Sequence, residues 1–249
     1  MSQTQQATLL DRIRLPLYFL ALIWGIHFVQ YAMGWNLGYL GVYPRTLSGA
    51  KGILLAPLIH ADFKHLINNS IPFFALGSIM LYFYPRVAVK SFIRIYFFTG
   101  LMVWLIGNFF FCGLEYGHRC NSYHIGASGV VYGLATFIMG TGIFRRNIKS
   151  IVLALIVLFY YSGMFMGILP REEGVSWESH LYGGIIGLLV AWYHRRELET
   201  DEVAIPPSWA EEESGDGTYF LPRDVFDMTK YERYQRELKE RDDWTSIER

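Results

Sequence analysis

Acidic residues are scarce through most of this chain. Of its 22 Asp and Glu residues, only six precede Arg195 and the other 16 follow it. The formal net charge is zero, and no concentrated basic face remains once the charges beside apolar runs are set aside, so we expect no nucleic-acid partner. Because 52% of the residues are hydrophobic and 18% charged, we expect residues 15–195 to be embedded in a membrane and residues 196–249 to form an acidic tail in water.

Cysteine is equally scarce. The two cysteines, Cys112 and Cys120, are eight residues apart, and this spacing leaves a disulfide and free thiols both open. His118 and His124 lie nearby in the sequence. The spacing of these four residues matches no standard zinc pattern, so we expect no metal site.

Long runs of apolar residues make up most of the chain before Arg195. The first follows Arg12 and Arg14, is long enough to cross a bilayer, and has no small-residue cleavage site behind it, so we expect a retained helix and not a signal peptide. Short interfacial helices are expected between Leu47 and Leu55. Six runs are predicted to be membrane-spanning helices: 15–33, 65–84, 91–111, 127–144, 148–168 and 177–194. The expected fold class is therefore an all-α membrane protein, a six-transmembrane-helix bundle preceded by a polar segment, 1–14.

Six spans place both termini on one side of the membrane. Nine basic residues flank that side of the predicted bundle and five flank the other, so the positive-inside rule predicts cytoplasmic N and C termini. It follows that His65, Asn69, Ser128 and His180 lie near the outer ends of their helices, at one depth.

The stretch Gly126-Ala127-Ser128-Gly129 places a serine among small residues at the start of the fourth span. Two interpretations are open, a helix-packing surface and a presented nucleophile. His180 lies at the matching depth, and Gly183 and Gly187 share its helix face, so a second helix can pack closely there. We therefore expect Ser128 and His180 to form a hydrogen-bonded dyad, with Tyr132 one turn below to hold the imidazole.

Acyl transfer also needs donors for the developing oxyanion. His65 and Asn69 are four residues apart, so they share one face of the second helix, and both can donate a hydrogen bond. With the backbone N–H of Ser128 they would form an oxyanion hole. The alternative is that they bond loop backbone at the membrane boundary, the role that we expect for His60 and Asp62.

This combination resembles the rhomboid family of intramembrane serine proteases over the six spans. The residues that carry the resemblance are His60, His65 and Asn69 as His-x4-His-x3-Asn, then Gly126, Ser128 and Gly129, then Tyr132, then His180 with Gly183 and Gly187. The resemblance implies a rhomboid-like bundle with Ser128 as nucleophile, His180 as base, and His65, Asn69 and the Ser128 amide as oxyanion hole. It implies cleavage of transmembrane or membrane-entering protein substrates near the outer face of the bilayer, without metal or cofactor. The expected location is a bacterial inner membrane, as a multi-pass protein.

The sequence departs from the family pattern in three places. Ser179 stands where the family usually has Ala before the active-site His, and no Trp-Arg pair lies between Trp35 and His60. The acidic tail has no counterpart in the minimal family core. The tail holds a charged segment expected to be helical, Asp224 to Asp243, interpreted as a solvated appendage, with docking of a cytoplasmic partner as the alternative.

Two other functions compete with a protease. A catalytically inactive relative that binds membrane segments would be expected to lose Ser128 or His180, and this chain keeps both. A transporter or channel would favour charges within the spans or inverted repeats, and we find no repeat and almost no charge within the spans.

Overall fold

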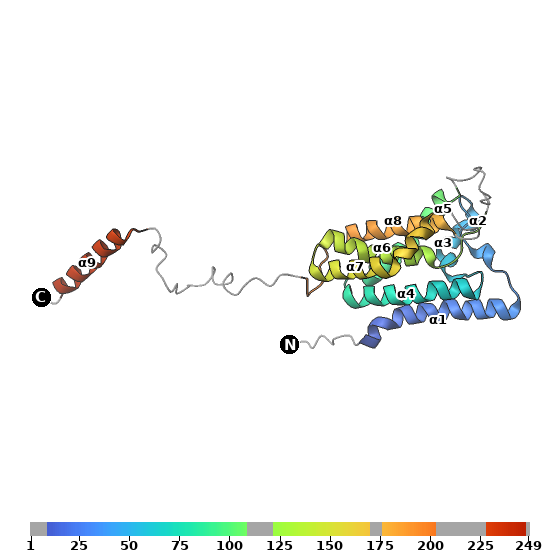
Figure 1. The fold of residues 1–249 in the computed structure, drawn as a ribbon, viewed down its shortest axis with the longest axis horizontal. Coiled ribbons are helices and arrows are strands. Elements are labelled where there is room, and N and C mark those ends of the chain that lie inside the picture. The colour runs from blue at the N-terminus through green and yellow to red at the C-terminus, as the bar shows by residue number, and fades with distance from the viewer. Residues whose placement is uncertain (1–8, 109–121, 170–175, 203–227, 248–249) are drawn as a thin grey trace. The chain divides into compact units, whose positions relative to one another are not determined.

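The computed structural model describes residues 9–108, 122–169, 176–202 and 228–247. Within these ranges the regular elements are helices (Figure 1). One isolated antiparallel bridge joins Val42 to His124. The long helices are α1 (Leu9–Met33), α4 (Phe63–Phe83), α5 (Ala88–Ile106), α6 (Ser128–Arg145), α7 (Ile148–Tyr161), α8 (Trp177–Tyr193) and α9 (Lys230–Ile247). The short elements are the α-helices α2 (Leu47–Ala50) and α3 (Gly52–Leu55), and the 3-10 helices η1 (Gly38–Leu40), η2 (Ala56–Leu58) and η3 (Ser162–Ile168).

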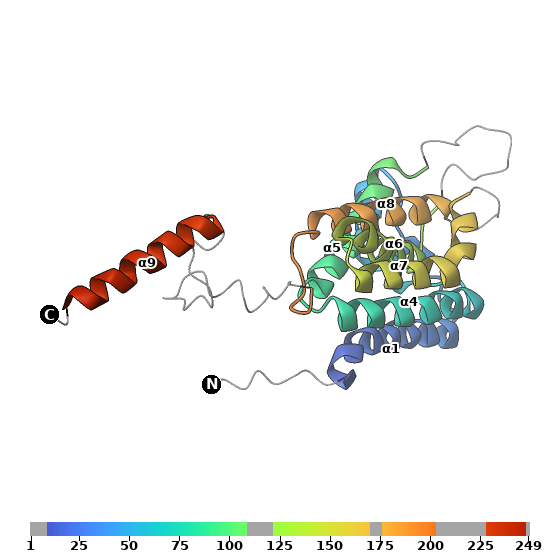
Figure 2. The same cartoon turned by 60° about the vertical axis from the view of Figure 1, so that its left-hand side comes forward.

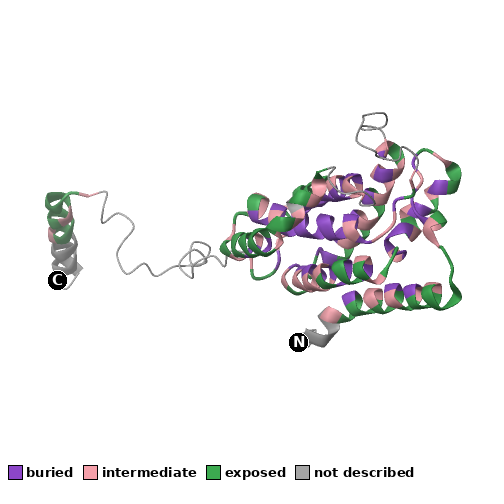
Figure 3. Ribbon diagram, turned by 45° about the vertical axis from the view of Figure 1, so that its right-hand side comes forward, coloured by how far each residue is buried: buried purple, intermediate pink, exposed green. Residues whose placement is uncertain are grey.

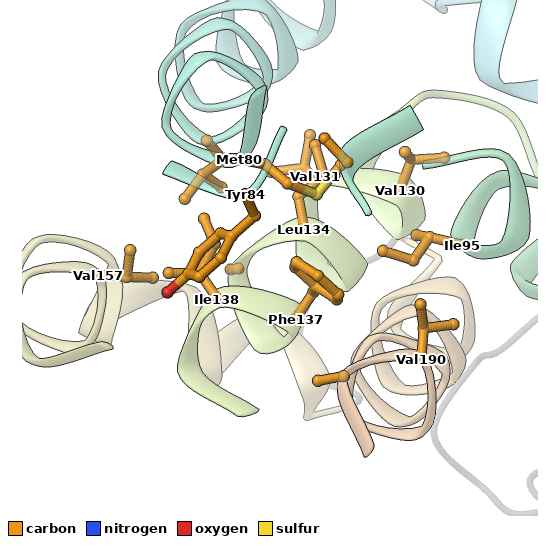
Figure 4. Close-up of a cluster of buried hydrophobic side chains, with 14 of the residues drawn as sticks. Met80, Tyr84, Ile95, Val130, Val131, Leu134, Phe137, Ile138, Val157 and Val190 are labelled. Atoms are coloured by element: carbon orange, nitrogen blue, oxygen red, sulfur yellow. The ribbon is translucent and has the colours of Figure 1, made fainter. Parts of the chain in front are cut away.

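Helix α6 is the centre of the first compact unit, Met1–Val203. Thirteen of its 18 residues are buried, and α4, α5, α7 and α8 pack around it. Figure 4 shows Leu134, Phe137 and Ile138 of α6 in contact with side chains from these neighbours, which together form the main hydrophobic core. Helix α1 lies outermost and packs on α4 (Figure 2).

The outer helices expose apolar side chains. Most of α1 is exposed or half-buried (Figure 3). In α7, Phe159 and Tyr160 are 78% and 75% exposed. Among the described residues, three helices are long and apolar enough to cross a membrane: Ile13–Met33 within α1, α4 and α5. Because lipid can cover such faces, the all-helical membrane architecture agrees with the sequence. The count of six spans and the side on which the termini lie stay predictions.

Helices α6 and α8 approach each other closely because glycines line their contact. A Cβ on Gly183 would lie 2.0 Å from the carbonyl oxygen of Gly129, and one on Gly187 would lie 2.2 Å from that of Gly133. No other residue fits at this separation. The approach brings the N-terminal ends of α6 and α8 together.

The loop between α1 and α4 contains the short helices expected between Leu47 and Leu55. Arg45, at φ 57°, donates its backbone N–H to the Trp104 carbonyl at 2.8 Å, and the Trp104 indole donates to the Thr46 carbonyl at 2.8 Å. Arg45 Nη1 also donates to the Gly107 carbonyl at 2.7 Å. An arginine of the loop and a tryptophan of α5 therefore fix this loop, and no adjacent Trp-Arg pair is needed.

The segment after α8 packs back on the bundle. Arg145 Nη1 lies 2.6 Å from Glu202 Oε2, and these side chains are 0% and 1% exposed. The Glu199 carboxylate accepts the Arg86 N–H at 3.2 Å, and Lys149 Nζ lies 3.2 Å from Glu202 Oε1. The compact unit consequently continues to Val203, past the boundary predicted at residue 195. The reason is electrostatic, since the first acidic residues of the tail neutralise cations at the ends of α6 and α7.

The second compact unit, Ala204–Arg249, contributes α9 to the described residues. A helix was expected over Asp224 to Asp243, and α9 covers Lys230–Ile247. Thr229 Oγ1 accepts the Glu232 N–H at 3.4 Å and the Glu232 carboxylate accepts the Thr229 N–H at 2.7 Å, a reciprocal N-terminal cap that starts the helix at this point.

Candidate active site

Ser128 and His180 meet at the N-terminal ends of α6 and α8. Ser128 is the first residue of α6, and its Oγ lies 2.8 Å from Nε2 of His180 in the first turn of α8. On the other side of the ring, Nδ1 lies 2.8 Å from the carbonyl oxygen of Gly167. A carbonyl can only accept, so Nδ1 carries the proton and Nε2 of the neutral ring accepts from the Ser128 hydroxyl. This is the tautomer that a general base requires.

Tyr132 holds the imidazole from one face. Its ring is stacked on that of His180, with centroids 4.2 Å apart and planes 8° from parallel. Its hydroxyl donates to the carbonyl of Met164 in η3. A Cβ on Gly167 would lie 2.2 Å from the Tyr132 hydroxyl oxygen, so a larger residue there would displace the Tyr132 side chain from its place beside η3.

The carbonyls of Met164 and Gly167 belong to the candidate site, and the sequence does not point to them. Backbone oxygens leave no mark in the sequence, and the fifth apolar run was predicted to be a single span. The signal that could have located them is Gly167 itself, a glycine in an apolar run that ends opposite the serine. The Gly167 carbonyl orients His180 in the way that a buried carboxylate orients the histidine of a Ser-His-Asp triad.

Two side-chain donors lie beside the backbone that leads to Ser128. A Cβ on Gly126, which has φ 102°, would lie 2.6 Å from Nε2 of His65 and 3.5 Å from Nδ2 of Asn69. Only glycine combines this backbone conformation with so little room. Asn69 is 5% exposed, and its Nδ2 has no hydrogen-bond partner among the residues that the structure describes.

The backbone N–H of Ser128 completes this group of donors. Because α6 begins at Ser128, its first amides have no carbonyl partner within the helix. The helix N-terminus also favours negative charge at this point. The arrangement can therefore present three donors to one oxygen atom, from His65, Asn69 and the main chain.

His60 and Asp62 order the chain that lies under this site. His60 is 1% exposed, and its Nε2 accepts the Ala127 N–H at 3.5 Å. The Gly126 N–H donates to the Ala56 carbonyl at 2.9 Å, and Asp62 caps α4 by accepting the His65 N–H at 2.8 Å. Burial, with His65 beside it, lowers the pKa of His60 to about 3, so the ring stays neutral at physiological pH.

The glycines of the α6–α8 contact hold the pair at this distance. A Cβ on Gly129 would lie 2.9 Å from the Ser179 carbonyl, directly before His180. The residues that the sequence singled out therefore converge in the structure: His60, His65, Asn69, Gly126, Ser128, Gly129, Tyr132, His180, Gly183 and Gly187.

The remaining sequence candidates lie elsewhere. Cys112, Cys120 and His118 fall outside the described residues. Across the residues that are described, no three His, Cys, Asp or Glu side chains are arranged to hold a metal ion. Glu178 points away from His180, toward the backbone N–H of Asn108 at 2.9 Å.

The part of the chain that carries this site is similar to known proteins. A family model described as Rhomboid domain matches residues 49–197. The chain is similar to an uncharacterized protein of Mycobacterium tuberculosis strain H37Rv, at 36% identity over 180 residues, which are 71% of this chain and 72% of the relative. It is also similar to uncharacterized proteins of Mycobacterium bovis, at 36% over 180 residues with the same coverage, and of Mycobacterium leprae, at 32% over 183 residues, 71% of this chain and 68% of the relative.

Proposed function

The chain belongs to the rhomboid family, and from this premise we propose that it is a serine endopeptidase that cleaves protein substrates within the membrane. The observation that carries the proposal is the 2.8 Å contact between Ser128 Oγ and His180 Nε2, with His180 Nδ1 on the Gly167 carbonyl. A serine is a weak nucleophile until a base takes its proton, and this geometry supplies the base.

The reaction follows from the contacts. Ser128 Oγ attacks the scissile carbonyl carbon while its proton moves to His180 Nε2, and the resulting imidazolium keeps its Nδ1–H on Gly167. Asn69, His65 and the Ser128 amide donate to the oxyanion. His180 then gives its proton to the leaving amine, which leaves an acyl group on Ser128. In the second half, His180 deprotonates a water molecule that attacks the acyl carbon. The bond from that carbon to Ser128 Oγ then breaks, His180 returns the proton to Oγ, and the carboxylic acid product leaves.

The exposed apolar helices support the membrane setting. We propose six spans with both termini in the cytoplasm, in a bacterial inner membrane, so that the site lies near the outer face. A transmembrane or membrane-entering segment can then reach Ser128 from the lipid, and the polar groups at this depth would let water reach Ser128 for deacylation.

The test compares the wild-type protein with Ser128→Ala and His180→Ala in native membranes. We expect a fluorophosphonate probe to label the wild type and neither variant, and a model transmembrane substrate to be cleaved only by the wild type. Ser91→Ala is the matched control, because it removes a buried hydroxyl of α5 that has no partner among the described residues. Normal cleavage by Ser128→Ala would refute the mechanism. An inserted wild type that neither labels nor cleaves would favour a catalytically inactive, segment-binding relative.

A further inference from the structure

A buried polar network lies beside the candidate site and has no role in the chemistry just described. We call this network the tether, and it consists of Asn108, His124, Ser176, Glu178 and Ser179. Glu178 is 5% exposed and His124 is 6% exposed. Burying a carboxylate and an imidazole costs free energy unless both groups are well hydrogen-bonded, so we expect defined hydrogen bonds to hold these two side chains.

Asn108 is the first part of the tether. It follows α5 with φ 58°, a left-handed conformation that asparagine tolerates better than most residues. In this conformation its backbone N–H points at both carboxylate oxygens of Glu178, at 3.0 and 2.9 Å. Its Oδ1 lies 3.0 Å from His124 Nε2, and its Nδ2 donates to the Ser122 carbonyl at 3.4 Å. One residue therefore joins α5, α8 and the segment that leads to Ser128.

His124 is the second part. Its backbone pairs with Val42 through two hydrogen bonds of 2.9 Å, which fixes the chain four residues before Ser128. Burial lowers the pKa of His124 to about 4, so the ring is neutral. Nε2 faces two acceptors, Asn108 Oδ1 and a Glu178 oxygen at 3.8 Å, and therefore carries the proton. Nδ1 then accepts from the Ser176 hydroxyl at 2.5 Å.

The first turn of α8 is the third part. Ser176 is the N-cap of α8, and its Oγ accepts the Ser179 N–H at 3.4 Å. The same oxygen lies 2.6 Å from Ser179 Oγ and accepts from it, because the Ser176 proton is already directed at His124. Ser179 immediately precedes His180. An unbroken series of hydrogen bonds thus connects the segment before Ser128 to the turn that carries His180.

We propose that Glu178 and His124 are positioning residues that set the distance between Ser128 and His180. The inference rests on the proposed function, since it concerns the same reaction. They contact Asn108, Ser176 and each other, and together they join the two segments that carry the dyad. Loss of His124 breaks the bonds between the segment before Ser128 and α8, and loss of Glu178 breaks those between Asn108 and α8. Either change leaves the glycine contact deeper in the membrane intact and loosens the ends of α6 and α8, where the reacting atoms lie. A displacement of about 1 Å between reacting groups can lower a rate by about 100-fold.

The test measures kcat and KM of purified protein on a fluorogenic transmembrane peptide. Rates are expressed per active site, counted by fluorophosphonate labelling taken to completion. We expect Glu178→Ala and His124→Ala each to lower kcat by roughly 10- to 100-fold and to change KM by less than about threefold. Glu178→Gln should stay within about threefold of the wild type, because its amide oxygen still accepts the Asn108 N–H. The double variant should be little worse than His124→Ala, because that change alone already breaks the bonds between the segment before Ser128 and α8.

The matched control is Thr141→Val, near the opposite end of α6. Thr141 Oγ1 lies 3.0 Å from the Tyr84 hydroxyl and 2.7 Å from the Ile138 carbonyl, so this variant also removes buried hydrogen bonds. It should lower thermal stability and leave kcat per active site unchanged. Unchanged kcat per active site in both alanine variants would overturn the inference, as would a loss confined to KM. A wild type without cleavage or labelling would overturn the proposed function and this inference with it.

Discussion

The substitution Gly183→Ala tests whether the close approach of α6 and α8 determines activity. The new Cβ would lie 2.0 Å from the Gly129 carbonyl oxygen, and side-chain Cβ atoms essentially never come within 3.0 Å of another heavy atom. The helices must therefore separate by about 1 Å, the difference between these two distances. The obstacle is backbone on both sides, so no side-chain rotation relieves it.

The separation acts directly on the dyad. If the helices moved apart along the line from Ser128 to His180, the distance between Ser128 Oγ and His180 Nε2 would lengthen from 2.8 Å to about 3.8 Å, which is beyond hydrogen-bonding range. We expect kcat/KM on a fluorogenic transmembrane peptide to fall by about 100-fold. Overpacking of this kind costs about 1–3 kcal/mol, so much of the protein should remain folded and inserted.

Gly184→Ala is the control on the adjacent residue. Its Cβ would meet only the Thr136 methyl, at 3.6 Å, which is an ordinary van der Waals contact. Helix propensity favours this change by about 1 kcal/mol, so the variant should be active and at least as stable as the wild type. If Gly183→Ala keeps activity within about threefold of the wild type, the reasoning from helix separation is wrong. An equal loss in both variants would contradict it too.

Three further outcomes are expected. Asn69→Ala should lower kcat by about 10²- to 10³-fold with little change in KM in the same peptide assay, since it removes one oxyanion donor, and full activity would remove Asn69 from that role. The folded-state pKa values of His60 and His124 are lowered to about 3 and about 4, so the unfolded chain binds protons first as the pH drops below about 6.5. The free energy of unfolding in detergent should therefore fall by up to about 1.4 kcal/mol per pH unit for each of these two residues. A flat profile from pH 7 to 5 would contradict this. Glu202→Ala should cost about 3 kcal/mol because it removes the carboxylate that neutralises a buried guanidinium. Asp201→Asn, whose side chain is 64% exposed, should cost under about 1 kcal/mol in the same unfolding measurement.

Residues that share a helix face could be found from the sequence. Helical periodicity relates His180 to Gly183 and Gly187, and His65 to Asn69, whatever the rest of the chain does. Span counting then places these faces at one depth, and the structure brings Ser128 within 2.8 Å of His180. Helical periodicity and the expected depth were sufficient to find these residues, because the site residues on each helix are related by the spacing within that helix.

Features that depend on backbone atoms, or on contacts between residues far apart in the sequence, could not be found in this way. Hydropathy does not show that the fifth run changes from an α-helix to a 3-10 helix at Ser162, and this change directs the Gly167 carbonyl at His180. The tether joins residues from three separate segments. The acidic start of the tail suggested a solvated segment, since no local pattern shows that Glu202 neutralises a buried arginine of α6.

The pairing of Arg145 with Glu202 has a consequence for synthesis of the protein. The two residues are 57 positions apart, and α7 and α8 lie between them. A ribosome therefore releases the arginine long before its carboxylate partner exists, and α6 cannot reach its final environment until the chain beyond α8 has emerged. Assembly of the bundle is in this sense completed from its C-terminal end. A chain that ends before Glu202 would carry Arg145 without its neutralising carboxylate, and its bundle would stay incompletely assembled.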